Sequence, residues 1–219
     1  LAPEMRILNN DRGDISFNIV DTPLRLAPDA TTITSWQNDN SGNGFPTGDG
    51  LTTNDEYLGV YYPSGLSSDL GGNTIMVPAS HMALRTYLYN DNVAFPWFAP
   101  AGTRRGTIDN ALSIGYLNAT TGEFITTKTR IGIRDVLYTN FINPMVYFTG
   151  NGLLNYGNKT SFNSQSALDR TNVARLIAYM RRQLTLAGRP YVFEPNDGFT
   201  RGQIANTIES LCLDLVAKR

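Results

Sequence analysis

Residues 74–106, TIMVPASHMALRTYLYNDNVAFPWFAPAGTRRG, place a strand signal, a turn, a helix signal and a loop in immediate succession. Residues 74–77 form a short apolar run that Pro78 ends. Ser80 is a residue type that favours the N-cap of a helix. Apolar residues at positions 82, 84, 87 and 88 then predict a helix to about residue 92. This order of elements indicates an α/β unit at the centre of the chain.

The loop that ends this stretch, residues 97–106 (WFAPAGTRRG), combines aromatic side chains, proline and paired arginines between glycines. Trp and Arg are enriched where proteins contact proteins, and proline lowers the entropy lost when a loop becomes ordered. We therefore expect Trp97, Arg104 and Arg105 to belong to an interface.

The regions that flank this unit on its N-terminal side are predicted to be mostly extended. Residues 1–36 read as extended, with a half-buried strand at 15–20, where apolar and polar residues alternate. Residues 37–56, rich in Asn, Asp, Gly and Ser, are expected to form a flexible loop. A buried strand is predicted at 57–62, and short extended pieces are predicted between 107 and 127.

The C-terminal third carries the strongest helical signals. This third of the chain is preceded by a short helix at 134–141, a strand at 145–148 and a hairpin turn at Gly150-Asn151-Gly152. Ser166 and Asp169 have the spacing of a capping box, and residues 173, 176, 177, 180 and 184 follow a helical period that Gly188 and Pro190 end. A strand at 191–193 and a second helix, capped by Asp197 or Thr200, complete the chain. The apolar face of this last helix is expected to include a buried Cys212. The first helix carries further interface candidates largely off its apolar stripe: Arg170, Arg175, Arg181 and Arg182.

Composition narrows the possible functions. The chain has 219 residues, is 41% hydrophobic and carries a net charge of −1, which gives no general attraction to nucleic acid. Only 17% of its residues are charged, against roughly 25% in an average domain, so its surface must be rich in uncharged polar groups that favour assembly. The absence of a run of about 18 apolar residues argues against membrane insertion.

The sequence matches several catalytic and ligand-binding patterns in part, but it contains none of them in full. His81 is the one histidine and Cys212 the one cysteine, so neither a serine triad nor a usual zinc site is expected. Residues 152–160 depart from the phosphate-binding loop pattern by one inserted residue. Asp39, Ser41, Asn43 and Gly44 resemble the start of a calcium loop, but Gly50 stands where the bidentate Glu is required. We therefore expect no catalytic residue, metal or cofactor, and a protein that is not an enzyme.

Six motifs in sequence order resemble the C-terminal half of contractile tail sheath proteins of large myovirus-type bacteriophages. The resemblance covers residues 57–219. Its six motifs are Tyr61-Tyr62-Pro63; Val77-Pro78-Ala79-Ser80; residues 97–106; Ile142-Asn143-Pro144, followed by Gly150, Gly152 and Gly157-Asn158-Lys159-Thr160; the segment from Asp169 to Leu176; and Phe193-Glu194-Pro195-Asn196-Asp197.

The resemblance implies an α+β fold with mixed sheets and packed helices. Residues 1–125 would be part of a middle α/β domain and residues 126–219 the core of a C-terminal sheath domain. It also implies a structural, cofactor-free subunit of the phage tail, made in the host cytoplasm. Such subunits form helical rings around a tail tube protein without direct contact to nucleic acid, add strands to each other's sheets, and contract to drive the tube through the host envelope for genome ejection. The six arginines would include charges re-paired during contraction.

Two further expectations concern the ends of the chain and the alternatives. Leu1 and the terminal Lys218-Arg219 are what excision by a trypsin-like protease would leave. Because the family's C-terminal arm is then missing, the fragment is expected to be monomeric. The alternatives are a virion-associated or secreted glycan-binding module, suggested by the aromatic and Asn-rich composition, and an enzyme with carboxylates that the sequence does not pair.

Overall fold

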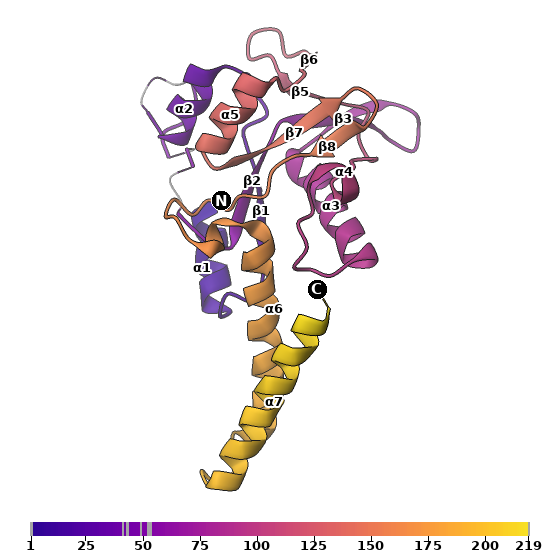
Figure 1. Ribbon diagram of the computed structural model, residues 1–219. Helices are drawn as coiled ribbons and strands as arrows, with labels where there is room; N and C mark the ends of the chain where they lie inside the picture. Colours follow the sequence, from indigo (N-terminus) through magenta and orange to yellow (C-terminus); the bar gives the residue numbers. More distant parts are fainter. Residues whose placement is uncertain (1, 41, 43, 49, 52–53, 219) are drawn as a thin grey trace.

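The structure, a computed structural model, describes residues 2–40, 42, 44–48, 50–51 and 54–218, and within them the strands form two four-stranded sheets (Figure 1). In the first sheet, three parallel strands and one antiparallel strand lie in the order β1 (Asn18–Asp21), β2 (Leu58–Tyr62), β7 (Ile142–Phe148) and β8 (Gly152–Asn155). The second sheet is antiparallel, in the order β4 (Thr74–Val77), β3 (Ser64–Ser68), β5 (Ser113–Leu117) and β6 (Phe124–Thr126). Pro63 separates β2 of the first sheet from β3 of the second. Together with the helices this is an α+β fold with mixed sheets, as predicted.

Strand β2 is the centre of the core because all five of its residues are buried. Alternate side chains of a strand point to opposite faces of the sheet. Leu58, Val60 and Tyr62 pack with α2 (Ala30–Gln37) and α5 (Ile131–Thr139) on one face. Tyr61 packs on the other face with Met82 and Tyr87 of α3 (Ala79–Val93). The predicted strand at 57–62 is thus confirmed as the strand on which both layers of the core are built.

Helix α6 (Thr171–Gly188) leaves the body and, with α7 (Gly198–Ala217), forms a projecting helical hairpin (Figure 1). Its first turns pack on the body through small residues, with Ala174 and Ala178 against Tyr57. The hairpin turns at η2 (Arg189–Tyr191), and α7 returns toward α3, so that the Lys218 ammonium lies 5.8 Å from the centre of the Phe95 ring. Asp197 caps α7 by accepting a hydrogen bond from the Thr200 amide, one of the two caps predicted.

The N-terminal region is helical where an extended chain was expected. Residues 2–11 form α1 (Ala2–Asp11) and residues 30–37 form α2, whose cap is Asp29. The Asp29 side chain accepts a hydrogen bond from the Thr32 amide at 3.1 Å, a local signal that the extended interpretation overlooked. Only β1, shifted to 18–21, remains of the extended region. The structure has no strand or helix in the described part of residues 38–57, and Ser41 and Asn43 of the calcium-like pattern lie outside the described residues.

Three predicted details in the helices are wrong for physical reasons. The N-cap position of α3 is Pro78, and Ser80 instead lies in the first turn, where its amide and hydroxyl both donate to the Asp21 carboxylate. Ser166 caps the short η1 (Ala167–Asp169), because Arg170 is extended and α6 begins only at Thr171. The short helix expected at 134–141 begins earlier, at Ile131, and ends at Thr139.

Two errors arise where apolar residues lie on the projecting hairpin. Residues 191–193 are not a strand, since they lie at the hairpin turn without a sheet neighbour, and the Phe193 side chain is 98% exposed. Cys212 is an exposed free thiol rather than a buried side chain. Helix α7 packs on α6 through one narrow face that includes Ile204, Leu211 and Leu215, and Cys212 lies beside that face.

The first sheet contains strands from both sides of residue 125, because β2, which pairs with β1, also pairs with β7, which pairs with β8. The proposed boundary at 125/126 therefore does not separate two independent sheets. The assignment of residues 1–125 and 126–219 to two sheath domains stays a prediction. The second sheet and helix α4 (Gly102–Arg105) lie next to the first sheet on the side of β8, as Figure 1 shows.

Candidate functional site

Arg175 is used inside the chain to join α6 to α3. Its guanidinium donates to both carboxylate oxygens of Asp91, at 2.8 and 2.6 Å, and lies 4.7 Å from the centre of the Tyr87 ring. The Arg175 side chain is only 11% exposed. This pair, in which one guanidinium nitrogen contacts both oxygens of an Asp91 side chain that is 35% exposed, helps to fix α6 relative to α3, because removing either partner leaves an unpaired charge.

Two more of the predicted interface arginines are also paired within the chain. Arg181 forms an ion pair of 2.7 Å with Asp14 and lies 5.3 Å from the centre of the Tyr57 ring. Arg170 forms an ion pair of 3.1 Å with Asp169 and donates to the Tyr138 hydroxyl of α5. Arg170, Arg175 and Arg181 thus connect α6, or the residue just before it, to three different parts of the chain.

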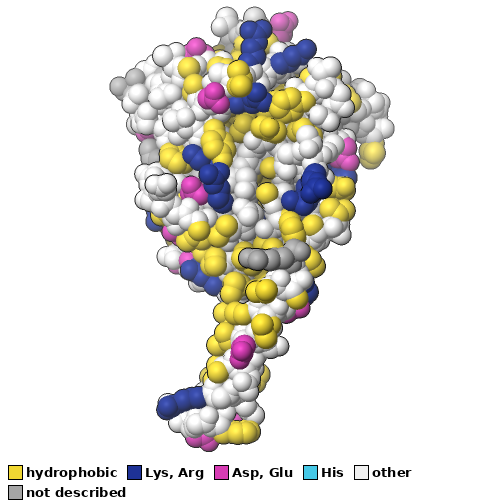
Figure 2. Space-filling model, in the orientation of Figure 1, with side chains coloured by type: hydrophobic (Ala, Val, Ile, Leu, Met, Phe, Trp, Pro, Cys, Tyr) yellow, Lys and Arg dark blue, Asp and Glu magenta, His cyan; other side chains and the backbone are white. Residues whose placement is uncertain are grey.

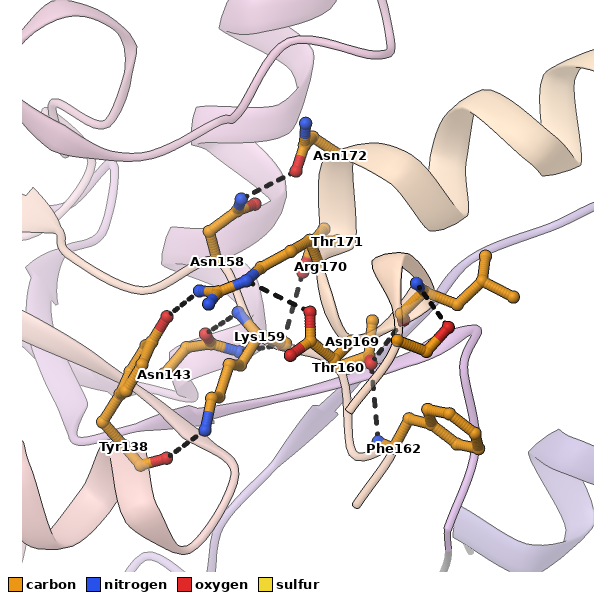
Figure 3. Close-up of polar contacts among 12 residues, drawn as sticks. Tyr138, Asn143, Asn158, Lys159, Thr160, Phe162, Asp169, Arg170, Thr171 and Asn172 are labelled. Atoms are coloured by element: carbon orange, nitrogen blue, oxygen red, sulfur yellow. Dashed lines mark hydrogen bonds and ion pairs between the residues drawn. The ribbon is translucent and has the colours of Figure 1, made fainter. Parts of the chain in front are cut away.

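A polar cluster lies at the root of α6, where the 157–160 segment meets α5 and β7 (Figure 3). The buried Asn143 side chain donates to the Lys159 carbonyl at 2.8 Å and accepts from the Lys159 amide at 2.7 Å. The Lys159 ammonium donates to the Tyr138 carbonyl and lies 4.6 and 4.9 Å from the centres of the Tyr138 and Phe141 rings. Burial, and then the nearby Arg170, lower the pKa of Lys159. In this conformation, Lys159 of the phosphate-loop-like segment serves an internal contact.

The loop at 97–106 is held in place by contacts with the rest of the fold and does not project freely into solvent. Trp97 stacks on Phe95 with ring centres 4.9 Å apart and packs against Tyr179 of α6 at 5.4 Å. The Arg105 guanidinium donates to the Ala99 carbonyl and lies over the Phe98 ring at 4.8 Å.

Buried amides anchor the same loop from the body. Asn155 of β8 donates to the Pro100 carbonyl at 2.8 Å, and Asn90 of α3 donates to the Phe95 and Phe98 carbonyls at 3.2 and 3.3 Å. At Gly106 a Cβ atom would meet the Asn155 carbonyl oxygen at 2.6 Å, so the loop requires glycine there. The roles of Asn90, Asn143 and Asn155 were not predicted from the sequence, where Asn143 stood out only as part of the Ile142-Asn143-Pro144 motif. The only sequence signal for them is a polar residue inside an otherwise apolar segment.

Arg104 and Arg182 differ from the other four candidate arginines. Both are exposed, and neither forms an ion pair or hydrogen bond within the part of the chain that the structure describes. Arg104 lies on α4. Arg182 lies on α6, at the rim of a groove of about 300 Å³ between α3 and α6. The structure therefore separates the six arginines into four that are engaged within the chain and two that are available to another molecule.

Strand β1 is an open edge of the first sheet. The Asn18 and Thr22 amides donate to β2, at the Tyr57 and Tyr61 carbonyls, so the backbone groups of Ile19 and Asp21 point to the other side. There they meet no backbone partner among the described residues. At the opposite edge, β8 is covered by residues 106–108 through backbone hydrogen bonds that include the Asn155 amide and the Gly106 carbonyl. An open strand edge is a template for pairing with another strand.

The described residues contain no group of three or more His, Cys, Asp and Glu side chains that could hold a metal ion. No helix among them is long and apolar enough to span a bilayer. With two available arginines and an open strand edge, the most prominent functional features of the described surface are suited to protein contacts.

Comparison with known sequences gives relatives of one kind. The chain is 37% identical over 124 residues to the tail sheath protein of Vibrio phage KVP40, a match that covers 56% of this chain and 16% of the relative. It is 35% identical over 111 residues to the tail sheath protein of Enterobacteria phage T4, covering 51% of this chain and 15% of the relative. The matched segment is thus only a small part of each relative. No protein-family model matches the chain.

Solved structures with a similar fold come from contractile machines. The fold matches a chain of the anti-feeding prophage baseplate in the contracted state with a TM-score of 0.65 and 19% identity, covering 99% of this chain and 53% of the other. It matches the anti-feeding prophage helical sheath in the contracted state with a TM-score of 0.64 and 21% identity, covering 81% and 44%. At these identities the likeness concerns the fold. This chain is therefore related in sequence to phage tail sheath proteins and has the fold seen in contractile sheath structures.

Proposed function

We propose that the chain is part of a structural subunit of a bacteriophage contractile tail sheath. The subunit polymerises around the tail tube and contracts to drive the tube through the host envelope for genome ejection. The observation that carries this proposal is the agreement of two comparisons: sequence relatives that are tail sheath proteins and a fold shared with a contracted helical sheath over 81% of the chain. The role is mechanical, with no catalytic step assigned to any residue.

The mechanism requires subunits that move as rigid bodies and exchange contacts. Contraction replaces one set of contacts between subunits by a set of lower free energy, and small gains add along the tail. The internal contacts of Arg170 with Tyr138, of Arg175 with Asp91 and of Arg181 with Asp14 support rigid-body motion, because they join the projecting hairpin to the body at several points.

The proposed contact residues are chosen by whether their side chains are already engaged within the described chain. Arg104 and Arg182 are exposed and are proposed to pair with carboxylates of neighbouring subunits. Trp97, Arg105, Arg170, Arg175 and Arg181 are engaged within the chain, and their part in an interface is proposed to be support of the surface around them.

The open edge of β1 is proposed to accept a strand from a neighbouring subunit. Adding a strand to a sheet edge gives backbone hydrogen bonds that hold a partner in a defined register. A flexible segment joining that strand to its own subunit would act as a hinge, so that neighbours stay linked while their surfaces slide. The tail tube protein is the second proposed partner. We further propose that the subunit is made in the host cytoplasm before it joins the tail.

A sedimentation experiment tests this function. The complete gene product, mixed at increasing concentration with purified tail tubes, is expected to form particles that pellet with the tubes. Residues 1–219 alone are expected to stay monomeric by light scattering. The proposal is contradicted if the complete gene product stays dispersed with and without tubes at every concentration tested.

A further inference from the structure

The groove between α3 and α6 has an apolar lining that the chain itself leaves uncovered. Its floor comes from the start of the first sheet, with Ile15, Phe17 and Ile19 one strand repeat apart. On one wall, Leu84 and Leu88 of α3 lie one helical turn apart and are 49% and 53% exposed. Ala178 and Tyr179 of α6 form the other wall. Exposed large apolar side chains grouped in a groove are characteristic of a binding surface.

The charges around the groove restrict its occupant. Arg175 and Asp91 both line it, but they neutralise each other. Arg182, at the rim, forms no ion pair within the described chain. The groove is therefore suited to an apolar segment that carries one carboxylate.

The outer face of α7 is a segment with these properties. Leu213 and Val216 are each 62% exposed, and with Cys212 they lie one and two turns beyond Glu209 on the same side of the helix. Glu209 is exposed and forms no ion pair with described residues, whereas Asp214 is paired with Lys218 at 2.6 Å. Hydrophobic side chains along the projecting hairpin are visible in Figure 2. The face thus presents apolar side chains with one available carboxylate.

The α7 helix of the same chain already packs against α6. Its inner face, with Ile204, Leu211 and Leu215 partly buried, packs against α6, so its outer face points away from α6. Because α6 forms one wall of the groove, the outer face of α7 cannot enter the groove of its own chain without leaving α6. A second copy can supply the same face without that rearrangement.

We propose that the groove of one copy receives the outer face of α7 from a second copy, with Glu209 of the incoming helix paired to Arg182. This contact rests on the proposed sheath function and names the surfaces that one subunit uses on another. Since groove and helix face are different surfaces, the contact is heterologous. The contact adds to the proposed strand exchange between subunits, and a heterologous contact repeated from copy to copy follows a ring or an open helix rather than a closed dimer.

A charge exchange tests the pairing. In the complete gene product, Arg182→Glu and Glu209→Arg are each expected to raise the concentration needed for assembly about tenfold, because each places like charges together. The double variant is expected to recover assembly toward wild type. Arg189→Glu, a charge reversal at an exposed residue at the hairpin turn, is the matched control and should assemble normally. Single variants that assemble as wild type, or a double variant as defective as the singles, would overturn the contact.

A cross-link provides a readout that does not depend on the charge variants. Leu88→Cys places a thiol in the groove opposite the native Cys212 of an incoming helix, and oxidation with diamide should join two copies by a disulfide. Leu112→Cys, at an exposed position that does not line the groove, should give no such product. If the wild-type protein assembles but the Leu88→Cys variant yields no linked copies, this contact alone is overturned. If the wild-type protein does not assemble, the proposed function is overturned as well.

Discussion

Asn143 joins three segments of the fold through one buried side chain. Its amide donates to the Val60 carbonyl of β2 and to the Lys159 carbonyl, and its carbonyl oxygen accepts from the Lys159 amide. Gly157 allows this approach, because a Cβ atom there would meet the Asn143 Cβ at 2.5 Å. Sequence reasoning identified Asn143 only as part of a motif that precedes a hairpin. Its role depends on residues 83 and 16 positions away in the chain, which no local pattern reveals.

Replacing Asn143 by Ala should destabilise the protein by about 3 kcal/mol. The change removes the acceptor of the Lys159 amide and the donor to the Val60 and Lys159 carbonyls, and a polar group left unsatisfied on burial costs roughly 1–3 kcal/mol. Chemical denaturation measures the free energy of unfolding. Asn206→Ala, on the exposed surface of α7, is the control and should change it by less than about 0.5 kcal/mol. Equal stability of the two variants would show that the Asn143 hydrogen bonds are unimportant.

Stability should fall above pH 10 because of buried tyrosines. Burial raises the pKa of Tyr62, whose hydroxyl donates to the Leu26 carbonyl, and raises the pKa of Tyr61 to about 12. Above pH 10 the unfolded chain releases these phenolic protons while the folded chain retains them. The folded state therefore loses about 1.4 kcal/mol per pH unit for each such tyrosine.

Tyr62→Phe should reduce this alkaline loss of stability by the contribution of one tyrosine, about 1.4 kcal/mol per pH unit. The measurement is the free energy of unfolding from pH 8 to pH 11.5, with the exposed Tyr147→Phe as control. A slope that Tyr62→Phe leaves unchanged, or that Tyr147→Phe alters equally, would contradict the assignment to burial.

At the scale of elements, helices with a clear apolar period were predictable and their packing was not. The positions of α6 and α7 were foreseen from apolar spacing and from the Asp197 cap. The most buried residues of α6 are Thr171, Ala174 and Ala178, however, rather than the larger apolar residues of the predicted stripe. Small residues allow a close approach to Tyr57, and this preference becomes visible only when the partner is known. Helix α1 was missed, and its apolar residues do not mark a core-facing side, because Ile7 and Leu8 are each 60% exposed while the buried residue of the helix is Asn9.

Hydrogen exchange should distinguish α7 from the helices that cover the core. Helix α7 has one buried residue, Thr200, whereas α3 has six. Local opening of α7 exposes little apolar surface, so its amides should exchange far faster than those of α3 and of the first two turns of α6. Mass spectrometry of peptic fragments from the isolated chain measures this difference. Equal protection of α7 and α3 would contradict the view that the hairpin is held mainly at its root.

At the scale of the molecule, the fold class was predictable and the usable surface was not. Buried strands, hairpin turns and helical periods, together with the family resemblance, indicated an α+β protein. The candidate arginines were chosen because charged residues lie off the apolar stripe, but ion pairing depends on distant residues such as Asp14 and Asp91. Only the structure separates Arg104 and Arg182 from those already paired. The groove beside Arg182 combines β1, α3 and α6, which lie far apart in sequence.

The internal pairing also bears on how the molecule would act in an assembly. A subunit whose hairpin is joined to its body through Arg170, Arg175 and Arg181 can transmit force without changing its own fold. Its changes would then be confined to exposed groups, the open β1 edge and the groove. This division between an internally fixed body and exchangeable surfaces is what the proposed sliding between two helical arrangements would require.

Negative-stain electron microscopy of the complete gene product tests the central claim most directly. A contractile sheath subunit is expected to form hollow tubes with regular striations, and residues 1–219 alone are expected to remain dispersed. A complete gene product that shows only dispersed particles at high concentration, with or without tail tubes, would contradict the sheath function.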